Sequence, residues 1–169
     1  KISAVIKFVN GDGEANTQTV NKYVGESVNG ADVTAPTKDA DKTYTYTFSH
    51  WATKNDDGTY TEVKFPIEVK GDATYYAIFA EKYINYTITY YAEDGQTEIG
   101  KTGYLHNGEE VTLDKGPSKA DTVLNTYEFA GWALTTEATK VYAETIKIDG
   151  ANINLKATYT AKDRYYAVT

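Results

Sequence analysis

The two tryptophans of the chain lie in segments that resemble each other, and this duplication constrains the fold more than any other feature. Trp51 belongs to "YTFSHWATKNDDGTY" (46–60), and Trp132 belongs to "YEFAGWALTTEATKVY" (127–142), 81 positions later. In each segment a Tyr-x-Phe triplet ends three residues before the tryptophan. A duplication of this length predicts two copies of one structural unit, because internal similarity at a fixed spacing is the signature of a repeat protein.

Other landmarks recur at nearly the same spacing. Pro36 corresponds to Pro117, and the closing segment "TYYAIFAEK" (74–82) corresponds to "NLKATYTAK" (154–162). We therefore expect two repeat units, 1–81 and 82–162. The remaining residues, 163–169, resemble the head of the second unit, since Tyr166 and Val168 align with Tyr86 and Ile88. They are interpreted either as the first strand of a third unit or as the terminal strand of the second.

The hydrophobic pattern of each unit is typical of strands. In "AVIKFV" the apolar residues alternate, so Ile6 and Phe8 share a face, and a turn rich in Gly, Asn and Asp follows. We expect strands at the head of each unit, at 17–24 and 100–106, before each tryptophan, and at 73–80 and 153–160. No segment keeps a period of 3.6 residues, so the sequence predicts two tandem, mainly-β domains with little helix.

Composition excludes several classes of function. The chain has 17 basic and 24 acidic residues, and its net charge of −7 opposes binding to nucleic acid. No apolar run is long enough for a membrane span. The chain has no cysteine, which excludes disulfides and thiolate zinc sites. Its 16 tyrosines, with many Thr, Val and Ile, favour strands.

The order "Y-x-I-x-Y…DG…GE-x-V…P…Y-x-F-x-G-W…A-x-Y" resembles the Listeria–Bacteroides repeat, also called the internalin-B-type B-repeat. The resemblance covers both units, and its most specific part is the Tyr-x-Phe-x-Gly-Trp of the second. It implies a β-rich α+β, β-grasp-like fold in tandem, within surface or secreted bacterial proteins, and no catalytic residues. Two features depart from the family pattern: His50 replaces the glycine found at Gly131, and both units are longer after the tryptophan.

Residue parity bears on where the tryptophans point. Phe48 and Trp51 have opposite parity, so a regular strand would place them on opposite faces. A β-bulge at His50 and at Gly131 would return both tryptophans to the core face. The structural core is expected to contain Phe8, Phe48, Trp51, Phe79, Tyr90, Phe129, Trp132 and Tyr159.

An alternative is that exposed aromatic residues of the first unit form a ligand surface. The outward residues of its closing strand include Tyr76 and Ile78, where the second unit has Lys156 and Thr158. An extra apolar stripe usually marks a contact, either with a neighbouring part of the chain or with a ligand. The candidate binding residues are Trp51, Tyr60, Tyr76, Ile78 and Tyr104.

The sequence gives little sign of other chemistry. The two histidines, His50 and His106, lack the glycine pattern that accompanies a nucleophilic serine, although Ser49 or Ser27 could be drawn into a triad. Acidic residues occur at turns, as at Asp12 and Glu14, without the distal acid of a calcium loop. We expect no catalytic residues, no metal and no cofactor.

Two functions remain. The first is a non-catalytic spacer or adhesion stalk in a secreted or cell-surface protein of a Gram-positive bacterium, as a monomeric part of a longer multidomain chain. The second is a binding module for a host or bacterial surface protein or a polysaccharide, through the exposed aromatic residues of the first unit.

Overall fold

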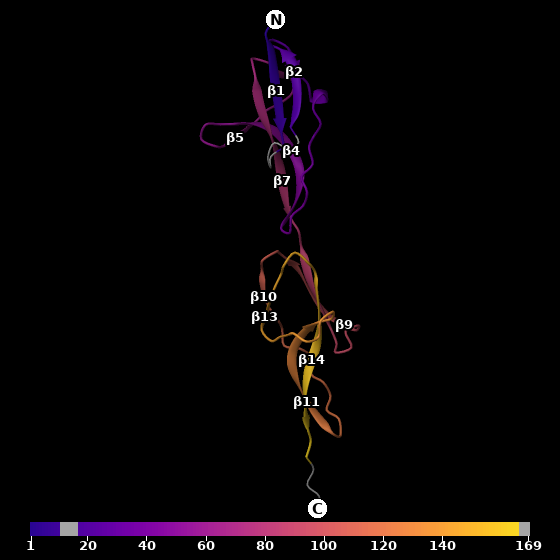
Figure 1. The fold of residues 1–169 in the computed structure, drawn as a ribbon. Coiled ribbons are helices and arrows are strands. Elements are labelled where there is room, and N and C mark those ends of the chain that lie inside the picture. The colour runs from indigo at the N-terminus through magenta and orange to yellow at the C-terminus, as the bar shows by residue number, and fades with distance from the viewer. Residues whose placement is uncertain (11–16, 166–169) are drawn as a thin grey trace, which may run out of the picture. The chain divides into compact units, whose positions relative to one another are not determined.

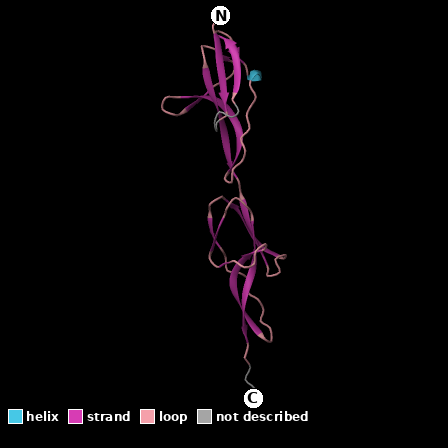
Figure 2. Cartoon of the chain, viewed as in Figure 1, coloured by secondary structure: helices cyan, strands magenta, loops and turns pink. Residues whose placement is uncertain are grey.

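The computed structural model describes residues 1–10 and 17–165, which form two compact units that divide between Lys82 and Tyr83. The regular secondary structure of both units is β-strand, and the strands are joined by loops (Figure 2). Within the described residues the only helical element is a single 3-10 turn, η2 (Gly30–Asp32). The predicted fold class, two similar β-rich units in tandem with little helix, is confirmed.

The first unit is built on a five-stranded sheet (Figure 1). Its strands, in spatial order, are β2 (Gln18–Tyr23), β1 (Ser3–Val9), β7 (Ala73–Tyr83), β4 (Tyr44–Lys54) and β5 (Tyr60–Glu62). A second, two-stranded sheet pairs β3 (Ser27–Val28) with β6 (Ile67–Glu68). The loop between β4 and β5 projects from the sheet in Figure 1, and it contains the "NDDG" turn.

The second unit repeats this order. Its five-stranded sheet runs β9 (Glu98–Leu105), β8 (Tyr86–Tyr91), β14 (Ile153–Asp163), β11 (Asn125–Leu134) and β12 (Val141–Tyr142). Its two-stranded sheet pairs β10 (Glu110–Thr112) with β13 (Thr145–Lys147). The expected strands are present, whereas the small second sheets were not predicted. Their strands are two or three residues long, too short for a periodic pattern to be visible.

The first and closing strands of each unit lie side by side and parallel at the centre of the sheet. In the first unit Ile6 of β1 is opposite Ala73 of β7, and in the second Ile88 of β8 is opposite Ile153 of β14. The pairs of β1 with β2, β4 with β5, β8 with β9 and β11 with β14 are antiparallel. Each unit therefore begins and ends on its two central strands.

One face of each sheet carries the core. Phe8, Trp51, Tyr90 and Trp132 are buried. Four half-buried aromatic residues pack against these cores: Phe48, Phe79, Phe129 and Tyr159. The last residue of β14 is Asp163, and the similarity of Tyr166 and Val168 to a strand of a third unit falls outside the described residues.

Candidate functional site

Trp51 was one of the candidate binding residues, and the structure places it in the core of its unit, as it does Trp132. Trp51 is 4% exposed and Trp132 is 3% exposed. The ring of Trp51 lies 5.0 Å from that of Phe8, and the ring of Trp132 lies 4.7 Å from that of Tyr90, measured between centroids. Trp51 therefore has no free ring face, and its assignment as a ligand platform is corrected.

A β-bulge turns Trp132 toward the core. The pairing of β11 with β14 shifts register between Phe129 and Gly131, so the two aromatic residues on either side of the shift share a face. Gly131 has a φ of +134°, and a Cβ there would lie 2.8 Å from the carbonyl oxygen of Tyr142. The position therefore requires glycine for two reasons, backbone conformation and space. The Thr158 hydroxyl donates to the Gly131 carbonyl at 2.7 Å.

In the first unit the phenylalanine and the tryptophan also pack together, but a histidine takes the place of the bulge glycine. The ring centroids of Phe48 and Trp51 are 5.4 Å apart, the same separation as for Phe129 and Trp132. His50 stands where Gly131 stands, but it is not among the described residues with positive φ. Ile78 replaces Thr158, so the hydroxyl that bonds the bulge carbonyl is missing from the first unit. The bulge expected at His50 stays a prediction.

The apolar outer stripe of the first unit is partly covered by its own hairpin. Tyr76 and Ile78 are half-buried, and the ring of Tyr60 on β5 meets the ring of Tyr76 edge-on at 5.8 Å. Tyr60 remains 47% exposed. The surface available to a ligand at this stripe is therefore mainly the outer side of Tyr60.

Tyr104 is the most exposed of the candidate binding residues, at 83%. It lies on the edge strand β9 at an irregularity where Tyr86 pairs with Leu105 and Ile88 pairs with Thr102. Gly103 and Tyr104 therefore lie opposite Thr87 alone, which makes them the two residues of a bulge. The φ of Tyr104 is 62°, which makes it the only non-glycine residue with positive φ in the described part of the chain. A tyrosine in this conformation is strained, since its Cβ crowds the following backbone.

The neighbouring Ser49 and His50 form the one serine–histidine contact that the sequence suggested. The Ser49 hydroxyl lies 3.0 Å from Nδ1 of His50. Among residues 1–10 and 17–165, no carboxylate bonds to His50, so the third member of a triad is missing. Ser27 lies on the short strand β3, which pairs with β6 in the two-stranded sheet, whereas His50 lies on β4 of the five-stranded sheet.

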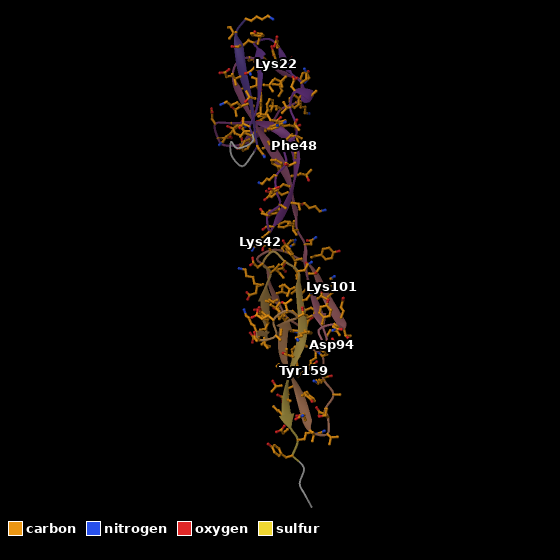
Figure 3. All side chains as sticks on the ribbon, turned by 45° about the vertical axis from the view of Figure 1, so that its right-hand side comes forward. Lys22, Lys42, Phe48, Asp94, Lys101 and Tyr159 are labelled. Carbon is orange, nitrogen blue, oxygen red and sulfur yellow. The ribbon has the colours of Figure 1, made fainter. Side chains whose placement is uncertain are left out.

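Carboxylates at the turns hold the turns themselves. Asp94 (labelled in Figure 3) accepts hydrogen bonds from the Thr97 hydroxyl and from two backbone N–H groups, which lowers its pKa to about 2. The Thr59 hydroxyl lowers the pKa of Asp57 in the same way. No group of three or more potential metal ligands occurs among the described residues. Asp12 and Glu14 lie outside them.

A lysine packed on a tyrosine recurs in both units, and we did not anticipate it from the sequence. Lys38 lies 4.0 Å from the ring centroid of Tyr46, and Lys119 lies 4.3 Å from that of Tyr127. Glu93 also pairs with Lys119 and raises its pKa. These contacts hold the proline-containing segment over the sheet. The signal was available, because both pairs align at a spacing of 81.

Comparison with known proteins agrees with this duplicated architecture. A model of the Listeria-Bacteroides repeat domain matches residues 5–78 and 86–158. No curated protein and no solved structure matches the chain. The described residues contain no helix that could cross a membrane.

Proposed function

We propose that this chain, which belongs to the Listeria–Bacteroides repeat family, is a non-catalytic spacer or adhesion stalk within a bacterial cell-surface or secreted protein. The observation that carries the proposal is the central parallel pair in each unit, β1 with β7 and β8 with β14. Because the two strands are parallel, a unit that starts on one and ends on the other has its two chain ends at opposite ends of the strands.

This arrangement makes each unit an efficient spacer. In the first unit three residues of β1 precede the Ile6–Ala73 pair, and ten residues of β7 follow it. At ~3.3 Å per residue, the unit spans about 43 Å from Ser3 to Tyr83. A unit whose first and last strands were antiparallel would have both chain ends at the same end of the strands, and it would add almost no length to a stalk.

The same arrangement suits a chain under tension. A force that pulls the start of β1 away from the end of β7 acts along both strands. It must therefore shear their hydrogen bonds together, whereas peeling an antiparallel hairpin breaks them one at a time. Resistance to shear is the mechanical property that a stalk between a cell and a surface needs.

Composition and family support the rest of the proposal. We propose repeat boundaries at 1–81 and 82–162 in a longer multidomain chain that is monomeric along this segment. The excess of acidic residues keeps neighbouring stalks apart. The absence of cysteine fits secretion by a Gram-positive bacterium, since folding then needs no oxidation system.

Single-molecule stretching tests the mechanical role. Because the chain has no cysteine, handles can be attached at introduced ones. Two double variants are compared. Pulling on Ser3→Cys/Tyr83→Cys shears β1 from β7, and pulling on Ser3→Cys/Tyr23→Cys peels β1 from β2. The sheared unit should lengthen by about 25 nm, from ~3.6 Å per residue of released chain, and at a clearly higher force.

Equal forces in the two geometries would contradict the mechanical proposal. Its cellular part is tested separately, by antibody labelling of intact bacteria that produce the protein. Labelling that appears only after the cells are permeabilised would contradict a surface location.

A second function is favoured by one observation, the pair of Tyr60 and Tyr76 on the first unit. Tyr60 offers an exposed ring held in place by its neighbour, and such rings stack on sugars or on partner side chains. A glycan array and a pull-down of surface proteins with the wild type and with Tyr60→Ala test it. Retention that does not depend on Tyr60, or no retention at all, would exclude this surface.

A further inference from the structure

The two units differ in a surface hollow beside the proline-containing segment. In the first unit the hollow is lined by Gln18 and Thr34 and does not reach Phe8 or Trp51, whereas in the second unit it reaches Tyr90 and Trp132. Gln18, on the edge strand β2, donates from Nε2 to the Thr34 carbonyl at 2.7 Å, and its Oε1 accepts from the Thr34 N–H at 2.8 Å. One primary amide thus satisfies both main-chain groups of a single residue in the segment that crosses in front of β2.

Strand register identifies the equivalent position in the second unit. Phe8 is opposite Gln18 in the first unit, and Tyr90 is opposite Gly100 in the second. Phe8 and Tyr90 are themselves equivalent, because each packs its ring against the tryptophan of its unit. Gly100 therefore stands in the place of Gln18, and no side chain fills the space in front of it.

A crevice of about 270 Å³ lies at this place. Tyr90 and Trp132 form its floor, while Gly100 and the segment from Asp114 to Pro117 form its walls. Glycine is not required here by the backbone, since its φ is not positive and a Cβ would meet its nearest neighbour, Cδ2 of Tyr90, at 3.8 Å. Glycine inside a strand often marks a bulge or the close approach of a ligand or another backbone. The pairing of β8 with β9 does shift register beside Gly100, and the shift leaves the space in front of Gly100 open.

In the second unit, the main-chain groups that correspond to those bonded by Gln18 are available. The equivalence of Pro36 and Pro117 places Lys115 at the position of Thr34. In the described part of the chain, the N–H and C=O groups of Lys115 take part in no hydrogen bond. The indole N–H of Trp132 is already used, since it donates to the Asp114 carbonyl at 2.9 Å.

We propose that this crevice binds the primary carboxamide of a glutamine side chain presented by a partner polypeptide. A primary amide carries a donor and an acceptor side by side, as two hydrogen bonds to one residue require. The secondary amide of an N-acetyl group directs its N–H and C=O in opposite directions and cannot make both. The first unit supplies the chemical precedent, because its own glutamine makes these two bonds.

Charge and topology narrow the ligand further. A carboxylate has no donor for the Lys115 carbonyl. It would also face the charge of Asp114, which lines the crevice. Burial chiefly, and the charge of Asp114 to a smaller extent, raise the pKa of the neighbouring Tyr90. The crevice adjoins the edge strand β9, along which an extended polypeptide can pair. This site does not depend on the spacer role.

Titration followed by NMR tests the inference on the whole chain. The probe is N-acetyl-L-glutamine methylamide, and the comparison probes are the corresponding derivatives of glutamate and methionine. We expect a saturable shift of the Lys115 amide signal with a millimolar dissociation constant for the glutamine derivative only. Gly100→Gln should fill the crevice from within and weaken binding at least tenfold. The reciprocal variant, Gln18→Gly, should create a second site that is detected at Thr34.

Several results would overturn the inference. They are the absence of a saturable shift at Lys115 in the wild type, equal binding of the methionine derivative, and unchanged binding by Gly100→Gln. If that variant does not fold, Gln18→Gly decides alone: a new saturable shift at Thr34 supports the inference, and none refutes it.

Discussion

Replacing Trp132 by alanine should strongly destabilise the second unit and leave the stability of the first unchanged. The side chain is 3% exposed, its ring packs against Tyr90 and Phe129, and its N–H bonds to Asp114. Truncation of a buried tryptophan to alanine costs about 3–5 kcal/mol. A unit of this size has a free energy of unfolding of about 4–12 kcal/mol, from ~0.05–0.15 kcal/mol per residue. The substitution therefore removes between a quarter and all of the stability.

The chain provides its own optical assay. Trp51 becomes the only tryptophan, so fluorescence reports on the first unit, whereas far-ultraviolet circular dichroism reports on both. Urea slopes for small domains are about 1–3 kcal/mol per molar, so a loss of ~3–5 kcal/mol should lower the urea midpoint of the second unit by roughly 1–5 M. We expect an unchanged fluorescence transition and a circular dichroism transition that splits in two.

A matched variant separates packing from hydrogen bonding. Trp132→Phe keeps an aromatic ring against Tyr90 but loses the bond to Asp114, and it should cost clearly less than alanine. If Trp132→Ala leaves one circular dichroism transition at the wild-type midpoint, the ring does not hold the core together. The reasoning from burial would then be wrong.

Three further predictions concern backbone and charge. Gly131→Ala should cost roughly 1–3 kcal/mol, because its φ of +134° strains any side chain, while His50→Ala, at a position without positive φ, should cost less in the same urea titration. Tyr104→Gly should relieve the backbone strain, which raises the free energy of unfolding of the second unit by about 0.5–1 kcal/mol and therefore raises its urea midpoint; a lower midpoint would show that the exposed ring is stabilising. Asp94 has a folded pKa of about 2 against an ordinary 3.8, so its contribution to stability is present above pH 4 and lost as the pH falls toward 2. Between pH 5 and pH 2 the melting temperature should therefore fall less steeply with pH for Asp94→Asn than for the wild type. Equal slopes for the two proteins would contradict this role of Asp94.

Much of the fold followed from local patterns. The repeat spacing and the alternation of residues predicted where the longer strands lie, because both can be counted along the chain. The bulge at Gly131 followed from parity, since an aromatic pair of opposite parity shares a face only if one residue is inserted. The bulge at Gly103 and Tyr104 could not be predicted, because nothing in "KTGYLH" distinguishes a regular strand from a bulged one.

The candidate sites were less predictable. The stripe at Tyr76 was visible in the sequence, but the ring of Tyr60 that covers it comes from another strand. The crevice beside Gly100 was not predicted, because the exposed aromatic residues on which the prediction rested lie mainly in the first unit. A glycine in a polar strand becomes informative only when register sets it against Gln18, whose amide reaches Thr34 from 16 residues away.

Two β units with aromatic cores could be predicted from the order of residues alone, because repetition, parity and composition act through neighbours along the chain. Long-range packing sets which strands meet: the parallel pairing of β1 with β7 joins residues 67 positions apart, as at Ile6 and Ala73. It also sets which hollows stay open, since a crevice exists only where one segment passes another and no side chain fills the space between. Both depend on contacts between distant residues, whose geometry no local pattern records.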